Sequence, residues 1–251
     1  MLDLNYFKAK KGKLNKCGGI VTIMDEWAKL IGSPELARIV ADITGDGHLQ
    51  LKGWRGLVSF YSKDFKAIAD LKGKFNKLFG VKGHVYTDNR VNKRYKLFFI
   101  SKPLAHFFEK IGVPKGNKTN SIYTVPSWVS QGNKKVKAEY LKGLFTGEGY
   151  IYSTKLKNNN VRWRIGIEQY KNEKIKEPGK LYMEQLRNML KNFKIKSSPV
   201  RFNGSNIRKD GTKSVGARFD IEKSNFGNFY KYIGFDNDEK QRKLLFAMRG
   251  H

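Results

Sequence analysis

The chain has 251 residues, of which 39% are hydrophobic, and carries a net charge of +28 from 50 lysines and arginines against 22 acidic residues. A chain of this length and apolar content can bury a core, as one large domain or as two smaller ones. The excess of positive charge points to a polyanionic partner, most simply nucleic acid, and the lone cysteine, Cys17, excludes an intrachain disulfide framework and a cysteine-based zinc site.

Residues 1–33 form a basic N-terminal extension, in which a lysine-rich run at 8–16 precedes an apolar patch at 20–31. The extension lacks a signal-peptide core and does not resemble a transit peptide, and no apolar run elsewhere is long enough to span a membrane. We therefore expect a cytoplasmic protein without a membrane partner, in a prokaryotic or archaeal host, with an organellar location left open. The extension either folds onto the domain that follows or touches DNA.

The first half, residues 34–113, opens with a helix that has Ser33 as its N-cap and Pro34 as its first residue. Alternating apolar and polar residues then indicate strands, and apolar residues at helical spacing indicate two more helices. The predicted elements are a strand pair at 48–51 and 58–61, a helix at 64–79, a hairpin of 81–88 and 94–101 around a turn at 89–92, and a helix at 103–112.

The second half, residues 137–251, repeats this order after a connecting segment at 114–136. Its strands are predicted at 150–154, 161–169, 198–203 and 215–222, and its later helices at 181–193, 226–233 and 236–248. The segments 107–112 and 229–234 are visibly the same, and an internal duplication of this size is a strong signal. We therefore predict an α+β fold of two pseudo-symmetric αββαββα halves, each with a four-stranded antiparallel sheet.

The first helix of each half ends in Thr-Gly-acid-Gly, at 44–47 and at 146–149. Residues four apart stack on one side of a helix, and small residues line one side of each: Ala37, Ala41 and Gly45 in the first helix, Gly143 and Gly147 in the second. Such stripes let two backbones approach closely. We therefore expect the two halves to pack through these helices, which would make Asp46 and Glu148 neighbours.

Asp46 and Glu148 predict a metal site. Two carboxylates held close repel each other unless a cation lies between them, and Mg²⁺ takes one or two carboxylates together with water and substrate phosphate. We expect Mg²⁺ or Mn²⁺ as the cofactor, held by the two acids and by the glycines that precede them, Gly45 and Gly147. The alternative is that both acids are ordinary C-cap residues, but negative charge is unfavourable at a helix C-terminus and the pattern occurs twice.

The segments 39–47 and 141–149 resemble the two signature sequences of the LAGLIDADG homing endonucleases, in the single-chain form that carries both copies. The second copy is the closer match, because Asp42 in the first stands where an apolar residue is usual. The resemblance covers roughly residues 34–248. It implies a monomeric, site-specific endonuclease that cuts both DNA strands across the minor groove and leaves 3′ overhangs, with Ca²⁺ binding without supporting cleavage.

The resemblance also implies that the two sheets form a saddle over a long, pseudo-palindromic site in double-stranded DNA. Polar and basic residues gather at the outward positions of the predicted strands, from which they can reach base edges in the major groove. The residues predicted to contact DNA are Gln50, Lys52, Arg55, Ser59, Tyr61, Lys63, Lys82, His84, Tyr86, Arg94, Lys96, Tyr152, Lys155, Arg162, Arg164, Lys171, Arg201, Asn203, Arg208, Lys209, Lys213 and Arg218. A solvated sheet face is the alternative for any one of them.

Lys118 and Lys240 are paired by the duplication, because each follows the glycine that ends the preceding helix, Gly112 or Gly234, at the same interval. Basic groups beside a reacting phosphate polarise it or orient the attacking water, so we predict a catalytic role for both lysines. Anchoring a phosphate away from the chemistry is the alternative. Gln169 ends a predicted strand near the expected centre and could order solvent there.

Two other functions fit the same scaffold: an intron maturase that binds RNA without nuclease activity, and a DNA-binding regulator. The presence of both acids favours the nuclease, because a protein that only binds phosphate has no use for carboxylates that face it. Protein-splicing motifs are not evident, since residue 1 is methionine rather than a nucleophile and the sequence ends in Arg249-Gly250-His251 rather than in His-Asn. We therefore expect a free-standing, intron-encoded protein rather than an intein.

Overall fold

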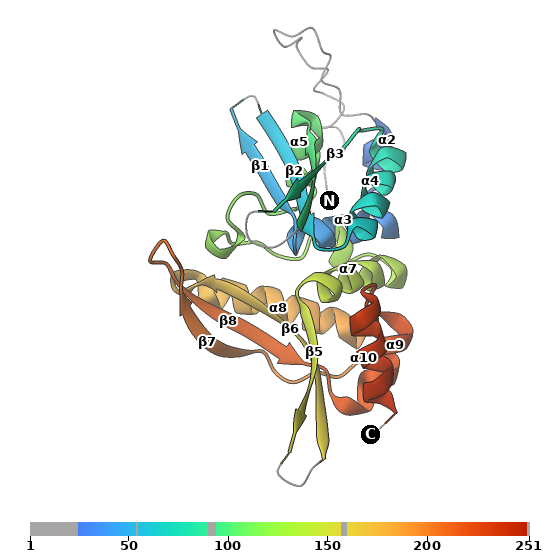
Figure 1. The fold of residues 1–251 in the computed structure, drawn as a ribbon, viewed down its shortest axis with the longest axis vertical. Coiled ribbons are helices and arrows are strands. Elements are labelled where there is room, and N and C mark those ends of the chain that lie inside the picture. Colours follow the sequence, from blue (N-terminus) through green and yellow to red (C-terminus); the bar gives the residue numbers. More distant parts are fainter. Residues whose placement is uncertain (1–24, 54, 90–93, 157–159, 250–251) are drawn as a thin grey trace, which may run out of the picture.

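The chain folds into two halves that meet along two central helices, α3 (Pro34–Thr44) and α7 (Lys134–Gly147), as Figure 1 shows. The structure is a computed structural model that describes residues 25–53, 55–89, 94–156 and 160–249. Each half holds a four-stranded antiparallel sheet. The strand order is β1 (His48–Lys52), β2 (Arg55–Ser62), β4 (Arg94–Ile100), β3 (His84–Asp88) in the first half and β5 (Gly149–Lys155), β6 (Val161–Asn172), β8 (Lys213–Asp220), β7 (Arg201–Ile207) in the second. The predicted α+β fold of two similar halves is therefore confirmed.

The first half follows the predicted order closely. After α3 it contains β1 (His48–Lys52), β2 (Arg55–Ser62), α4 (Phe65–Phe79), β3 (His84–Asp88), β4 (Arg94–Ile100) and α5 (Lys102–Lys110). The helices begin where side chains can accept hydrogen bonds from their free backbone N–H groups. Ser33, Asp64 and Ser101 do so for α3, α4 and α5.

The N-terminal extension folds onto this half where the structure describes it. Helix α2 (Asp25–Lys29) carries Trp27, which is buried and packs edge-on against Phe79 and Phe107, with ring centroids 5.8 and 5.9 Å away. The lysine-rich run at 8–16 lies outside the described residues, as does most of the turn predicted at 89–92.

The second half departs from the prediction mainly at the starts of its helices. The predicted connecting segment holds a 3₁₀ turn, η1 (Lys118–Asn120), and a short helix, α6 (Ser127–Ser130). Helix α7 begins within that segment because Asn133 accepts a hydrogen bond from the N–H of Val136. Helix α8 (Lys176–Lys191) begins before the predicted residue 181, since Pro178 is tolerated in a first turn.

The other elements of the second half are β5 (Gly149–Lys155), β6 (Val161–Asn172), η2 (Glu173–Ile175), β7 (Arg201–Ile207), β8 (Lys213–Asp220), η3 (Lys223–Asn225), α9 (Phe226–Tyr232) and α10 (Asp238–Met248). None of the helices in the described part of the chain is long and apolar enough to cross a membrane.

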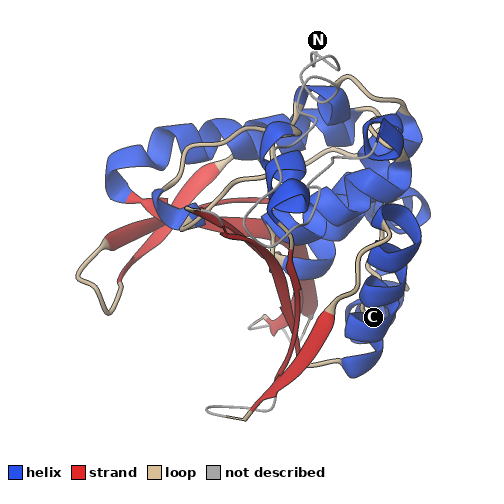
Figure 2. Cartoon of the chain, turned by 90° about the horizontal axis from the view of Figure 1, so that it is seen from above, coloured by secondary structure: helices blue, strands red, loops and turns tan. Residues whose placement is uncertain are grey.

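The helices cover one face of each sheet and leave the other face open. Figure 2 shows the strands of both sheets along the inner side of an arch, with the helices outside it. Aromatic side chains fill the space between the layers, such as the stacked Phe75 and Phe99 in the first half and Phe145 against Phe229 in the second. Since side chains alternate across a strand, the inner side of the arch presents the residues that do not enter this core.

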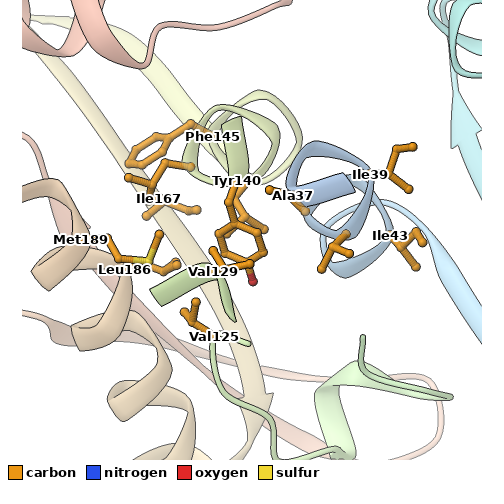
Figure 3. Close-up of a cluster of buried hydrophobic side chains, with 14 of the residues drawn as sticks. Ala37, Ile39, Ile43, Val125, Val129, Tyr140, Phe145, Ile167, Leu186 and Met189 are labelled. Carbon is orange, nitrogen blue, oxygen red and sulfur yellow. The ribbon is translucent and has the colours of Figure 1, made fainter. Parts of the chain in front are cut away.

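The two halves share one continuous core through α3 and α7. Tyr140 of α7 is fully buried and lies between Ala37 of α3 and a cluster that includes Ile167, Leu186 and Met189 (Figure 3). The helix pair therefore acts as the packing centre of both sheets.

Candidate active site and nucleic-acid interface

The two signature helices touch along their small residues. A Cβ atom added to Gly143 would lie 2.7 Å from the Cβ of Ala41, and one added to Gly147 would lie 2.8 Å from Oδ2 of Asp46. Both distances are shorter than van der Waals contact allows. A side chain at position 143 would clash with the fixed Cβ of Ala41, whereas one at position 147 would displace the carboxylate of Asp46. The packing brings Gly45 against the side chain of Glu148, with 3.5 Å between an added Cβ and Cγ. Asp46 and Glu148, each just beyond its helix, therefore become neighbours.

The two acids influence each other electrostatically. Burial raises the pKa of Glu148, and the negative charge of Asp46 raises it further, while Lys118 and Lys240 lower it. Asp46 is the more exposed of the two acids. The site therefore holds a carboxylate pair whose repulsion is only partly offset by lysines, which is the situation that a bound cation would relieve.

Lys118 binds the C-terminal end of α3. Its Nζ donates to the carbonyl oxygens of Ile43 at 3.1 Å, Thr44 at 2.8 Å and Gly45. Burial lowers the pKa of Lys118 to about 8, although Glu148 and Asp46 pull it upward.

Lys240 binds the end of α7 in the same way. Its Nζ donates to the carbonyl oxygens of Thr146 and Gly149, both at 2.7 Å, and to that of Gly147 at 3.4 Å. Burial lowers the pKa of Lys240, and both acids raise it. Cations are favourable at helix C-termini, so the two lysines offset the carbonyl charge that would otherwise oppose acids at these positions. Each predicted lysine thus lies beside both acids; their catalytic role stays a prediction.

The donor set fits a hydrated divalent cation. The described residues contain no group of three or more His, Cys, Asp or Glu side chains suited to a metal, so this part of the chain offers the acid pair alone. Carbonyl oxygens have two lone pairs, and those of Gly45 and Gly147 could accept from a lysine and still face a metal. Mg²⁺ keeps several waters and uses few protein ligands, which matches this set better than a cage made entirely of protein groups.

Many of the residues predicted to contact DNA lie on the open face of the sheets. In the first sheet Tyr61 and Tyr86 both lie opposite Lys96, and in the second Arg162 lies opposite Thr154 and Arg164 opposite Tyr152. The exposed members of the predicted set are Gln50, Lys52, Arg55, Tyr61, Lys63, Lys82, His84, Tyr86, Arg94, Tyr152, Lys155, Arg162, Arg201, Arg208, Lys209 and Lys213. Apart from Lys155 and Lys213, the strand residues among them lie on the inner side of the arch and make it strongly basic.

Four members of the predicted set are placed differently by the structure. Ser59 points to the open face, but it is covered by its neighbours and only 1% exposed. The register places Lys155 opposite Val161, and it puts Lys213 on the same side of β8 as buried Ala217 and Phe219, which is the helix-covered side of the sheet. Lys171 is buried on that same side. The expectation that the side chain faces outward was therefore wrong for Lys155, Lys171 and Lys213, because it relied on local polarity, whereas the strand register decides the face.

Some predicted contacts are already paired within the protein. Arg201 forms an ion pair with Asp220, and Asn203 donates to Glu168 at 2.9 Å. Gln169 lies on the same face of β6 as Ile167, and its Nε2 donates to the hydroxyl of Tyr123 at 2.6 Å. The Oε1 atom of Gln169 has no partner in the described structure. Each of these groups keeps further donors or acceptors beyond the one that is paired.

The sequence interpretation missed an ionic network on one side of the helix pair. Arg38 of α3 donates to Asp42 at 2.9 Å and pairs with Asp236 of the second half, whose other oxygen lies 3.5 Å from Lys142. The backbone N–H of Asp236 in turn donates to Thr146 of α7. The unusual charge of Asp42 in the first signature was the available signal.

His48 was missed as well. It is the first residue of β1, two positions after Asp46, and lies opposite Ser59 on the open face. Burial and the charges of Lys118 and Lys96 lower the pKa of His48. Its polarity fits the basic inner side of the arch, but a single histidine with no metal-ligand spacing gave no signal in the sequence.

Comparisons with known proteins agree with this geometry. Residues 135–234, which include the second signature and its sheet, match the family model described as a LAGLIDADG-like domain. The homing endonuclease I-WcaI, solved bound to its DNA recognition sequence, has a similar fold, with a TM-score of 0.52 and 17% identity over 97% of this chain and 98% of that one. The matches show a LAGLIDADG-like domain at residues 135–234 and a similar fold over the whole chain.

Two curated relatives have names that describe other activities. The chain is 28% identical to the tRNA-splicing ligase RtcB of Pyrococcus furiosus over 82% of its length, which is 22% of the ligase. It is 29% identical to the RNA polymerase subunit Rpo1N of Methanocaldococcus jannaschii over 83% of its length, which is 16% of the subunit. The chain thus spans about a fifth of the curated relatives it matches, and the shared segment is common to proteins named for different activities.

Proposed function

We propose that the chain is a site-specific, divalent-metal-dependent endonuclease that cuts both strands of DNA, as a homing endonuclease does. The observation that carries the proposal is the placement of Asp46 and Glu148, side by side at the ends of two packed helices and next to two half-buried lysines. A protein that only bound nucleic acid would gain nothing from a carboxylate pair on a basic surface. The similar fold of an endonuclease bound to its recognition sequence supports the proposal.

In this proposal the two acids, with the carbonyl oxygens of Gly45 and Gly147, hold the metal. When bound, the metal supplies Lewis acidity at the phosphate and lowers the pKa of a coordinated water. Lys118 and Lys240 are positioned to bind a phosphate oxygen or to orient the attacking water. The pKa of Lys118, lowered to about 8, lets this lysine exchange a proton near neutral pH.

Each half contributes one acid and one lysine, so we propose that each half serves one DNA strand. Cuts on opposite strands across the minor groove would leave 3′ overhangs. The two related sheets line one arch (Figure 2), which suits a long, pseudo-palindromic target. Both halves belong to one chain, so a monomer has a complete site. A cytoplasmic location and an intron-encoded origin stay predictions.

A selection for cleaved molecules from a random double-stranded DNA library, in Mg²⁺, tests the proposal. We expect a long preferred site, cut on both strands, with no product in Ca²⁺ or EDTA. The Asp46→Asn variant is the matched control for a contaminating nuclease. A chain that cut no sequence in Mg²⁺ or Mn²⁺ would contradict the proposal, and binding to intron RNA without DNA cleavage would identify a maturase instead.

A further inference from the structure

Lys171 is a buried lysine in a protein whose other lysines mostly face solvent. It lies near the end of β6, opposite Val215, and is only 3% exposed. Gly179 of α8 makes room for it, since a Cβ atom there would lie 2.5 Å from Cγ of Lys171. Burying an amine is unfavourable unless polar groups bind it, so its partners indicate its role.

All partners of the Lys171 amine belong to one short segment of the chain. Nζ donates to the carbonyl oxygens of Lys118 at 2.7 Å and Ser121 at 2.9 Å, and it lies 3.6 Å from the ring centroid of Tyr123. These acceptors bracket η1, the 3₁₀ turn that carries Lys118. Burial and the charge of Lys118 lower the pKa of Lys171 to about 7.

This turn is held partly by its own groups, since the Thr119 N–H donates to Asn117 Oδ1 at 3.1 Å and the Ser121 hydroxyl donates to the Asn117 carbonyl at 2.9 Å. Its hydrogen bonds to β6 come from Lys171 and from Asn172, whose Nδ2 donates to Asn120 at 3.2 Å. A single 3₁₀ turn makes few internal hydrogen bonds of good geometry, and one of its bonds, from the Ser121 N–H to the Lys118 carbonyl, is 3.4 Å long. The side chain of Lys118 nevertheless reaches three carbonyls at the end of α3. The position of that ammonium therefore depends on where its own backbone is held.

We propose that Lys171 is a positioning residue, which anchors the η1 turn and thereby holds Lys118 at the candidate active site. The anchor serves one half only. Lys240 is carried instead by α10, which begins at its N-cap Asn237, next to the Asp236–Arg38 ion pair. Loss of Lys171 therefore affects one of two otherwise related sites. The part of this inference that concerns cleavage rests on the proposed function.

The first experiment requires no cleavage. Hydrogen exchange of residues 115–123 and chemical acylation of Lys118, both followed by mass spectrometry without DNA or metal, are compared in wild type, Lys171→Met and Lys77→Met. Lys77, on the exposed side of α4, is the control for loss of a lysine. In Lys171→Met we expect both rates to rise at least about tenfold, as loss of buried hydrogen bonds implies. Unchanged rates would overturn the proposal.

The second experiment measures the cleavage rate of each strand, with end-labelled target from the selection. Lys171→Met should slow one strand by about 10²-fold, the cost of misplacing a group by about 1 Å, and leave the other near the wild-type rate. The double variant with Lys118→Met should be no slower than Lys118→Met alone. Equal slowing of both strands, or additive effects, would show a general structural role and overturn the proposal.

The two experiments separate the two proposals. If the wild-type chain cuts no DNA, the proposed function fails, while the exchange and labelling rates still decide whether Lys171 anchors Lys118. If Lys171→Met does not fold, Tyr123→Leu replaces it, because that variant keeps the lysine and removes the aromatic face. Faster exchange confined to 115–123 then supports the anchor, and unchanged exchange overturns it.

Discussion

The two lysines beside the acid pair, Lys118 and Lys240, occupy equivalent positions in the two halves, yet the chain supports them by different means. Lys118 lies on a 3₁₀ turn that is tied to a buried network of Lys171, Tyr123 and Gln169. Lys240 lies in the first turn of a regular helix that follows the ion pair of Asp236 with Arg38. The ammonium groups of the two lysines are therefore placed alike, whereas the contacts that hold the two lysines in place differ.

The same contrast runs along the helix pair. Arg38 and Asp42 of α3 correspond in sequence to Tyr140 and Leu144 of α7. On one side Arg38 forms the ionic network, and on the other the hydroxyls of Tyr140 and Tyr182 lie 3.2 Å apart in the core. Symmetry is therefore kept in the acids, the lysines and the small residues. The support on each side depends on which secondary elements happen to cover it.

The largest effect is expected when one of the two acids, which occupy equivalent places in the two halves, is changed. Asp46→Asn or Glu148→Gln deletes one negative charge from the carboxylate pair, so double-strand cleavage should fall by at least about 10²-fold. DNA binding should be largely retained, and one variant could survive as a strand-selective nickase. The cleavage rate of each strand measures the first effect, and filter binding measures the DNA affinity. Wild-type cleavage rates would remove both acids from the active site.

A change where α3 packs against α7 should disturb both halves together. Gly143→Leu places side-chain atoms where a Cβ already lies 2.7 Å from Ala41, and overpacking of this kind costs about 1–3 kcal/mol. The melting temperature should fall, and both strands should be cut more slowly because the acids separate. Gly73→Leu on α4, where nothing lies within 4 Å of an added Cβ, is the matched control and should not destabilise the fold. Equal melting temperatures for the two variants would contradict the packing.

The ionic support can be broken on its own. Asp236→Asn removes the charge that pairs with Arg38, which costs about 1 kcal/mol for a partly exposed pair. The start of α10 should loosen, so cleavage should slow on the strand served by Lys240. Asp236→Asn and Lys171→Met, measured side by side, should slow the cleavage of opposite strands. If both slow the same strand, the two supports are not specific to one half.

The recognition face of the second half can be tested at single base pairs. Arg162 and Arg164 lie two apart on β6 and share the open face. If one pairs with a guanine, its change to alanine should cost about 1–3 kcal/mol and relax specificity at one position. A residue that only anchors phosphate should weaken all sequences alike and reduce the salt slope by about one. Affinities for single-base variants at several salt concentrations distinguish these results, and unchanged binding in both variants would exclude this strand from the interface.

The last test concerns pH and separates Lys171 from the support of the other half. Its pKa is lowered from 10.5 to about 7 in the folded chain. Between these values the unfolded chain binds more protons, so this lysine stabilises the fold less as pH falls towards about 7. The melting temperature of Lys171→Met relative to wild type should therefore rise from pH 10 to pH 7, whereas that of Asp236→Asn should show no such trend attributable to Lys171. A constant difference for Lys171→Met would show that its amine is not buried.

Local patterns in the sequence determined the repeated framework. Cap residues such as Ser33 and Asp64 set helix starts, and alternation set most strands, because both signals act between residues close in the chain. The small-residue stripes predicted the helix pair, and the repeated Thr-Gly-acid-Gly predicted that Asp46 and Glu148 meet. Both inferences succeeded because helical periodicity fixes which residues share a face.

Only the tertiary structure decided which partners the polar side chains find. Lys171 reads as an outward basic residue, but the register of β6 turns it into the core, where it meets a segment more than fifty positions earlier in the chain. Arg38 and Asp236 are farther apart still. Such contacts depend on which elements pack across each other, and no local periodicity encodes that. The sequence by itself therefore placed the acids and lysines of the site, and the packing of the two halves decided how each lysine is held.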